Sequence, residues 1–188
     1  MKDLYCLPES VCFAGTTYRL NTDFRVMLKI FRALEDDSLP EILRWQVALK
    51  LFYCEPIPPA CRPQAMQYLA DFLCCGQEGT PGKPLFHWQA DADAIIAGVN
   101  AVAGREVRTM EKVHWWTFLA WFHAMPPGQL STRVSIRQKL QKGQKLDTWE
   151  QEFYRENKKT VDMRSPLTPE EQAEKDRLNA MLDRKNRH

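Results

Sequence analysis

The sequence predicts an all-α, mainly helical protein: a compact bundle of about seven helices with a small N-terminal β-hairpin and a charged C-terminal tail. Apolar residues recur at three- and four-residue steps from residue 22 to residue 161, which is the helical period. The 6 Trp, 5 Tyr and 9 Phe are too many for a disordered chain, and only 8 residues are glycine. We therefore expect one helical domain over residues 1–163 and a weakly helical or disordered tail over residues 164–188.

A short β-hairpin is predicted over residues 8–20. Apolar and polar residues alternate on either side of Ala14–Thr17, and this loop contains Gly15. A lone hairpin is marginally stable, so we expect it to pack on the helical body.

The first two helices are indicated by capping residues and apolar spacing. Asn21 or Thr22 can cap the first helix, and Asp23 falls in its first turn, where the helix dipole favours a carboxylate. Ser38 and Glu41 have the spacing of a capping box at the start of the second helix. The apolar stripe expected on this second helix consists of Ile42, Trp45, Leu49 and Phe52.

The remaining helices follow the same signals. We expect helices over residues 63–75, 91–103, 112–125 and 132–141, and a seventh opened by a capping box at Asp147 and Glu150. Residues 76–84 have the composition of a surface loop.

The helix over residues 112–125 is apolar on nearly all sides. Successive helical residues point about 100° apart, so Trp115 and Trp116 cannot share a face. Such a helix is buried or covered by a partner. The candidate core or partner-binding residues are Trp115, Trp116, Phe118, Trp121 and Phe122.

Charge is distributed unevenly although the whole chain carries only +2. Residues 129–188 contain 14 Lys and Arg against 10 Asp and Glu. The candidate basic face of the sixth helix consists of Arg133, Arg137, Lys139 and Lys142. Such a face can bind the phosphates of a nucleic acid. Interleaved acidic residues favour a solvated, salt-bridged face instead, so a nucleic-acid partner is the alternative interpretation.

Catalytic and cofactor sites are not indicated. The sequence has no phosphate-binding, nucleophile-elbow or zinc-protease motif, so we expect no catalytic residue, metal or cofactor. The six Cys include no C-x-x-C pair, and we expect free thiols, with Cys54, Cys74 and Cys75 buried in apolar segments. The first ten residues hold no apolar run of signal-peptide length, and no stretch reaches the roughly 18 apolar residues that cross a bilayer. We therefore expect no membrane partner.

Two short motifs give the chain a resemblance to a known family. T-D-F-R stands at residues 22–25 and H-W-W-x-F at residues 114–118; further matches are Gly15, Asp91, Ile95-Ile96 and Ile136-Arg137. In this order, over about residues 8–163, they resemble the bacteriophage gene-product-fifteen family. None of them is catalytic, and their physical sense is packing.

The resemblance implies a non-enzymatic role in phage tail assembly. Members are encoded among the tail genes of long-tailed phages and prophages, and they are regarded as tail assembly chaperones or related proteins. We therefore expect this chain to bind the tape measure protein in the host bacterial cytoplasm. The tail tube protein is a second expected partner, and a homo-oligomer is also compatible with the resemblance. The alternative function is that of a phage regulatory protein that binds nucleic acid through the basic C-terminal third.

Overall fold

The structure is a computed structural model that describes residues 6–75 and 84–162. The described residues group into two compact units. Unit 1 consists of the described residues of Met1–Pro84 and Ala92–Leu130, and unit 2 of those of Leu85–Asp91 and Ser131–His188. We predicted one domain over residues 1–163, whereas the contacts separate two units within that range.

Two predicted segments lie outside this description. The tail predicted over residues 164–188 is one, and the loop predicted over residues 76–84 is the other, apart from Pro84.

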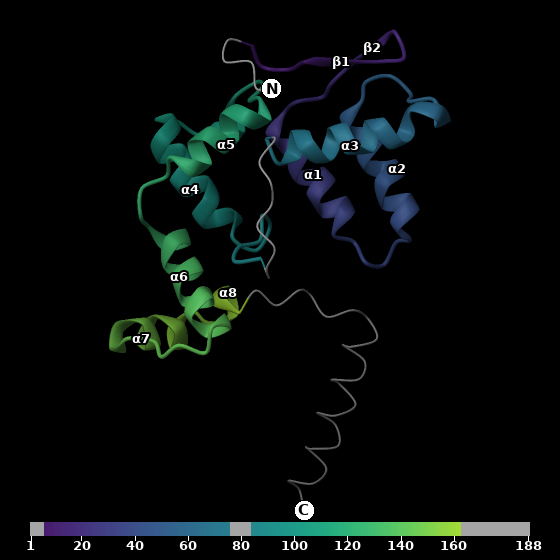
Figure 1. The fold of residues 1–188 in the computed structure, drawn as a ribbon. Helices are drawn as coiled ribbons and strands as arrows, with labels where there is room; N and C mark the ends of the chain where they lie inside the picture. Colours follow the sequence, from purple (N-terminus) through teal and green to yellow (C-terminus); the bar gives the residue numbers. More distant parts are fainter. Residues whose placement is uncertain (1–5, 76–83, 163–188) are drawn as a thin grey trace, which may run out of the picture. The chain divides into compact units, whose positions relative to one another are not determined.

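The described residues form eight α-helices and one antiparallel hairpin (Figure 1). This confirms the predicted mainly helical fold with an N-terminal hairpin. The elements of unit 1 are β1 (Ser10–Phe13), β2 (Thr16–Arg19), α1 (Phe24–Leu34), α2 (Glu41–Phe52), α3 (Arg62–Leu73), α4 (Ala92–Ala103) and α5 (Trp115–His123). Helix α6 (Gln129–Gln141) lies mostly in unit 2 and is followed by α7 (Thr148–Glu156) and α8 (Lys158–Val161). None of the helices in the described ranges is both long and apolar enough to cross a membrane.

The hairpin turn is tighter than predicted. The last cross-strand pair is Phe13 with Thr16, which leaves Ala14 and Gly15 as a two-residue loop. Both have positive φ angles, 47° and 79°, as a type I′ turn requires. The right-handed twist of the strands favours this turn, which Gly15 adopts without steric cost.

The helix starts follow local hydrogen bonding, which the sequence predicted only in part. Asp23 is the N-cap of α1, so the prediction of Asn21 or Thr22 as the cap was wrong. Ser38 bonds to Asp36 and does not cap α2.

The capping box at α7 is confirmed. Both of its reciprocal hydrogen bonds, between Asp147 and Glu150, are present.

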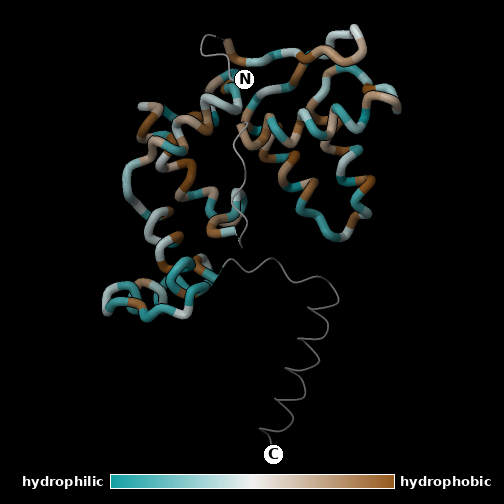
Figure 2. Tube along the Cα trace, viewed as in Figure 1, coloured by the Kyte–Doolittle hydropathy of each residue, from teal (hydrophilic) through white to brown (hydrophobic). Residues whose placement is uncertain are grey.

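The core of unit 1 is apolar and largely aromatic. Helix α1 packs against α2 and α5, and α4 packs against α5. Brown, hydrophobic residues recur along each of these helices, whereas α7 in unit 2 is mostly teal (Figure 2). The largest fully buried side chains of unit 1 are Phe24, Met27, Ile30, Phe52, Leu69, Val99, Val107, Trp115 and Phe118.

Unit 2 has a different kind of core. Ile136 and Val161 are buried there, but so are four charged side chains. These are Asp91, Arg133, Arg137 and Glu150. Because buried charges are costly unless paired, each of these side chains needs a partner of opposite charge within the unit.

Candidate partner-binding surface

The two motifs that carry the resemblance meet in unit 1. The backbone N–H of Trp115 donates to the carbonyl of Thr22 at 2.7 Å. The rings of Phe24 and Phe118 stack with centroids 4.4 Å apart and an angle of 6° between their planes. T-D-F-R and H-W-W-x-F therefore form one packed junction, which we call the motif junction.

Asp23 and Arg25 fix the backbone at this junction. The Asp23 carboxylate accepts hydrogen bonds from the N–H groups of Arg25 and Val113, at 2.9 and 3.1 Å. The Arg25 guanidinium pairs with Asp23 and also donates to the carbonyls of Met110 and Glu111. Burial raises the pKa of Asp23, but the hydrogen bonds from Arg25 and Val113 outweigh burial and hold it below its usual value.

His114 links the motif junction to the N-terminal segment. It is the N-cap of α5, and its Nδ1 accepts from the N–H of Trp116 at 3.1 Å. Nε2 therefore carries the proton and donates to the Pro8 carbonyl, 3.2 Å away. Burial lowers the pKa of His114, while the contact with Pro8 partly opposes this shift. The neutral imidazole thus fits its site on both sides of the ring.

The candidate aromatic residues of α5 divide into two groups. Trp115 and Phe118 are fully buried, so no partner can contact them in this fold. The Trp115 indole donates to the Leu73 carbonyl and the Trp116 indole to the Phe72 carbonyl, each at 3.0 Å. These bonds tie α5 to the C-terminal end of α3. The half-buried members are Trp116, Trp121 and Phe122.

The candidate basic face does not exist as predicted. Arg133 and Arg137 are only 6% and 4% exposed, because both turn toward the buried carboxylate of Asp91. They cannot contact phosphates while unit 2 is folded. Their spacing on α6 is that of a solvent-exposed stripe. Asp91, which pairs with both, lies more than 40 residues away in the sequence.

Arg137 uses all five of its N–H donors. Two go to the Asp91 carboxylate, at 2.7 and 2.9 Å. The other three go to the carbonyls of Leu85, Thr160 and Val161. Burial raises the pKa of Asp91, but hydrogen bonds from Arg137, from the backbone of His87 and from Arg133 together lower it below its usual value. Asp91, which we assigned only to a helix start, is thus the centre of unit 2.

The two lysines of the candidate face lie in different surroundings. Lys139 is half-buried and donates to Glu150 and Asp147, at 2.7 and 3.1 Å, and these bonds raise its pKa. Lys142 is exposed. Of the four candidates, Lys142 alone combines exposure with no ion pair to another described residue.

Helix α2 carries apolar side chains that the fold leaves in solvent. Ile42, Leu43 and Val47 are 68%, 42% and 41% exposed. At about 100° per residue, Gln46 and Lys50 fall between Ile42 and Val47, so the five positions form one face about 140° wide. We call this face, residues 42, 43, 46, 47 and 50, the α2 band. The prediction that Ile42 belongs to the buried stripe was wrong: Ala48, Leu49 and Phe52 form that stripe.

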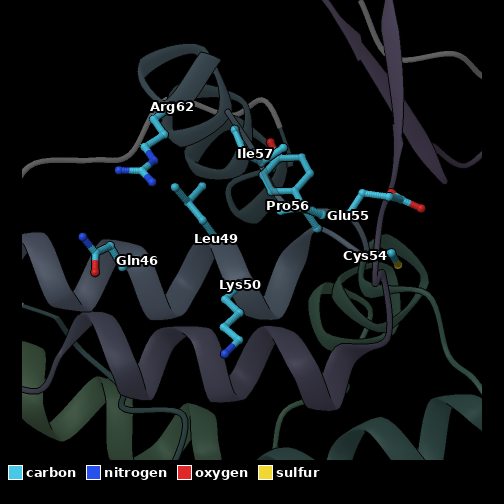
Figure 3. Close-up of a pocket in the computed structure, with 9 residues that line it drawn as sticks. Gln46, Leu49, Lys50, Cys54, Glu55, Pro56, Ile57 and Arg62 are labelled. Carbon is cyan, nitrogen blue, oxygen red and sulfur yellow. The ribbon is translucent and has the colours of Figure 1, made fainter. Parts of the chain in front are cut away.

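A pocket of about 540 Å³ opens beside the α2 band. Figure 3 shows Leu49 pointing from α2 toward Ile57 and Arg62, while Lys50 points away from them. Leu49, Pro56 and Ile57 supply the apolar part of the lining, and residues 53–57 belong to the chain that links α2 to α3. The residues that line the pocket are Gln46, Leu49, Lys50, Tyr53, Cys54, Glu55, Pro56, Ile57 and Arg62.

The charge at this pocket is predominantly positive. Lys50 and Arg62 form no ion pair with any described residue. The acidic lining residue, Glu55, pairs with Arg19 at 2.7 Å. That hydrogen bond holds the pKa of Glu55 below its usual value, so its charge is already compensated from within unit 1. The α2 band and its pocket together therefore present two uncompensated cations: Arg62 at the pocket and Lys50 on the band beside it.

One sequence signal could have revealed the α2 band. Eight of the twelve residues of α2, EILRWQVALKLF, are apolar. A helix that buries a single stripe needs fewer, so this excess indicates a second apolar face.

The cysteines are free thiols, as predicted. Their expected burial was wrong: Cys54 and Cys74 are exposed and Cys75 is half-buried. Cys54 immediately follows Tyr53, the buried C-cap of α2, and Cys74 follows Leu73, the buried last residue of α3.

Comparison with known proteins gives a family but no individual relative. No curated protein and no solved structure matches the chain. The family described as Bacteriophage Gp15 protein matches residues 3–163, a range that contains both the motif junction and the α2 band. The chain therefore belongs to the Bacteriophage Gp15 protein family.

Proposed function

We propose that this phage protein is a tail assembly chaperone that binds the tape measure protein during the morphogenesis of a long tail. The observation that carries the proposal is the α2 band, where three apolar side chains on one helix face are exposed to solvent beside a pocket that contains Leu49 and Ile57. Exposed apolar side chains that gather on one face of a helix are typical of an interaction site.

The proposed client suits this surface. The tape measure protein is long and helical, and its apolar faces need cover until tail tube subunits enclose it. A helical protein can cover such faces by helix-to-helix packing, which requires neither catalysis nor a cofactor. We place this association in the host cytoplasm, with the tail tube protein as a second partner and self-association as a further property.

Co-expression tests the function directly. The tape measure protein encoded by the same phage is produced with and without this chain, and its soluble fraction and co-purification are measured. We expect the client to stay soluble and to co-purify only in the presence of the chain. An insoluble client in both cases, with no complex, would contradict the proposal.

A further inference from the structure

We infer that the α2 band and its pocket bind an acidic amphipathic helix, that is, a client segment with carboxylates beside its apolar stripe. This inference rests on the proposed function for the identity of the client. Its chemistry follows from the exposed side chains and the uncompensated cations described above.

The shape of the band fits a helix. Helix α2 has 12 residues and is about 18 Å long, which matches about three turns of a partner helix. Side chains of two helices interdigitate when ridges of one fill grooves of the other. Leu43 and Val47, four residues apart, form such a ridge in solvent, and Ile42 begins the neighbouring row that continues through Gln46 and Lys50.

The pocket provides an anchor at the far end of the ridge. Leu49 and Ile57 are apolar, and about 540 Å³ accommodates a large aliphatic or aromatic side chain. Binding surfaces concentrate their affinity in such buried anchors. A client helix would therefore place one large apolar residue over Leu49 and smaller ones along Val47 and Ile42.

The two cations favour a client segment that carries negative charge. Arg62 lies at the pocket and Lys50 on the α2 band beside it, and Glu55 is already paired with Arg19. Carboxylates on the client would find hydrogen-bonding cations there, whereas a basic helix would meet two unpaired positive charges. Electrostatic complementarity contributes to specificity in this way more than to raw affinity.

Binding of tiled peptides tests the inference. Peptides of about 25 residues that cover the tape measure protein are titrated against the full chain, and their dissociation constants are measured by fluorescence anisotropy. We expect the binding peptides to share an apolar helical stripe with adjacent Asp or Glu. Exchanging those acids for Lys should weaken binding at least tenfold.

Two variants of the chain probe the surface. Ile42→Glu and Arg62→Glu change exposed residues in the first turns of α2 and α3, where a carboxylate suits the helix dipole, so the fold should persist. We expect Ile42→Glu to weaken the binding of every client peptide at least tenfold. Arg62→Glu should weaken the binding of the acidic peptides and strengthen the binding of their Lys-exchanged versions. Trp149→Glu changes an apolar residue of unit 2 that is also exposed, is the matched control and should leave binding unchanged.

The outcomes separate the inference from the function. If the parent and both variants bind the tape measure peptides equally, the α2 band is not the docking site, while the chaperone function stands. If neither the parent nor any variant binds the peptides or the whole client, the proposed function fails and the inference fails with it. If Ile42→Glu abolishes only self-association, measured by light scattering, the band is an interface between copies and the inference is overturned.

Discussion

At the scale of single residues, the motif junction contains one polar atom without a partner. The side chain of Thr22 is fully buried, and its hydroxyl bonds to none of the residues that the structure describes. A buried hydroxyl without a hydrogen bond costs free energy, because it has lost its water.

Replacing this hydroxyl should stabilise unit 1. We expect Thr22→Val to raise the free energy of unfolding by about 1 kcal/mol, because Val keeps the shape and removes the unpaired group. Thr22→Ala is the control and should lower stability, because it leaves a cavity. Urea denaturation followed by circular dichroism measures both. A less stable Val variant would show that the hydroxyl has a partner in solution.

His114 should make stability depend on pH. Its pKa is lowered in the fold from an ordinary value of 6.5, so the unfolded chain binds the proton more readily than the folded chain. The contribution of His114 to stability is therefore fully present above about pH 7, and it is lost as the pH drops through 6.5. Protonation of Nδ1 also removes the acceptor for the Trp116 N–H. The other charges near the ring are Glu9 and Lys112, which pair with each other.

A cap-preserving substitution isolates this effect. His114→Asn retains an acceptor for the Trp116 N–H but does not titrate. We expect its unfolding free energy to change less between pH 7.5 and 5.5 than that of the parent. His123→Asn, at an exposed position at the end of α5, controls for other histidines and should keep the parent slope. Equal slopes for His114→Asn and the parent would contradict the assignment.

At the scale of elements, the hairpin turn can be made more stable by substitution. Ala14 has a φ of 47°, where a Cβ atom is strained, and Gly15 follows it. We expect Ala14→Asn to stabilise the chain by about 0.5–1 kcal/mol, because Asn-Gly is the preferred type I′ pair. Ala14→Val should destabilise it instead. Thermal unfolding of the parent and the two variants measures this order of stability. Equal stability of the three proteins would contradict a left-handed backbone conformation at residue 14.

The elements also show which local signals predict structure. The period of three and four residues located α1 to α7, because burying one face of a helix imposes that spacing. The capping box of Asp147 formed, but that of Ser38 did not, because α2 begins at Glu41 with Pro40 as its N-cap, and the Ser38 hydroxyl donates to Asp36 instead. Spacing alone does not fix the first residue of a helix. On α2 the period concealed a second apolar face, since Ile42 fits the buried stripe equally well in sequence.

At the scale of the whole molecule, each of the two units has its own buried cluster. The motif junction organises unit 1, and Asp91 with Arg137 organises unit 2. Neither the division nor the second cluster was predictable from the sequence. Arg133 and Arg137 look like a solvent stripe on α6, and only the distant carboxylate of Asp91 makes them a core.

The ion cluster provides a test of this division. Arg137→Met leaves Asp91 buried without its main partner, and we expect a loss of about 3–5 kcal/mol in the stability of unit 2. Hydrogen exchange should show lost protection in α6 and α8. The amides of α1 and α3 should keep theirs, because their contacts lie within unit 1.

Lys142→Met is the matched control for this variant. Lys142 is exposed, so this substitution should change the free energy of unfolding by no more than about 0.5 kcal/mol. Equal loss of protection in both units of the Arg137 variant would show that they unfold together.

The motif junction has a consequence for synthesis of the chain on the ribosome. Asp23 and Val113, which bond to each other, are 90 residues apart. At about 5–20 residues per second, the start of α1 waits about 5–20 s for the segment that completes its cap and for the ring that stacks on Phe24. During that interval the emerging chain holds the hairpin, α1, α2 and α3 without α5. Co-translational folding of unit 1 is therefore a late event, set by the arrival of a single tryptophan-rich helix.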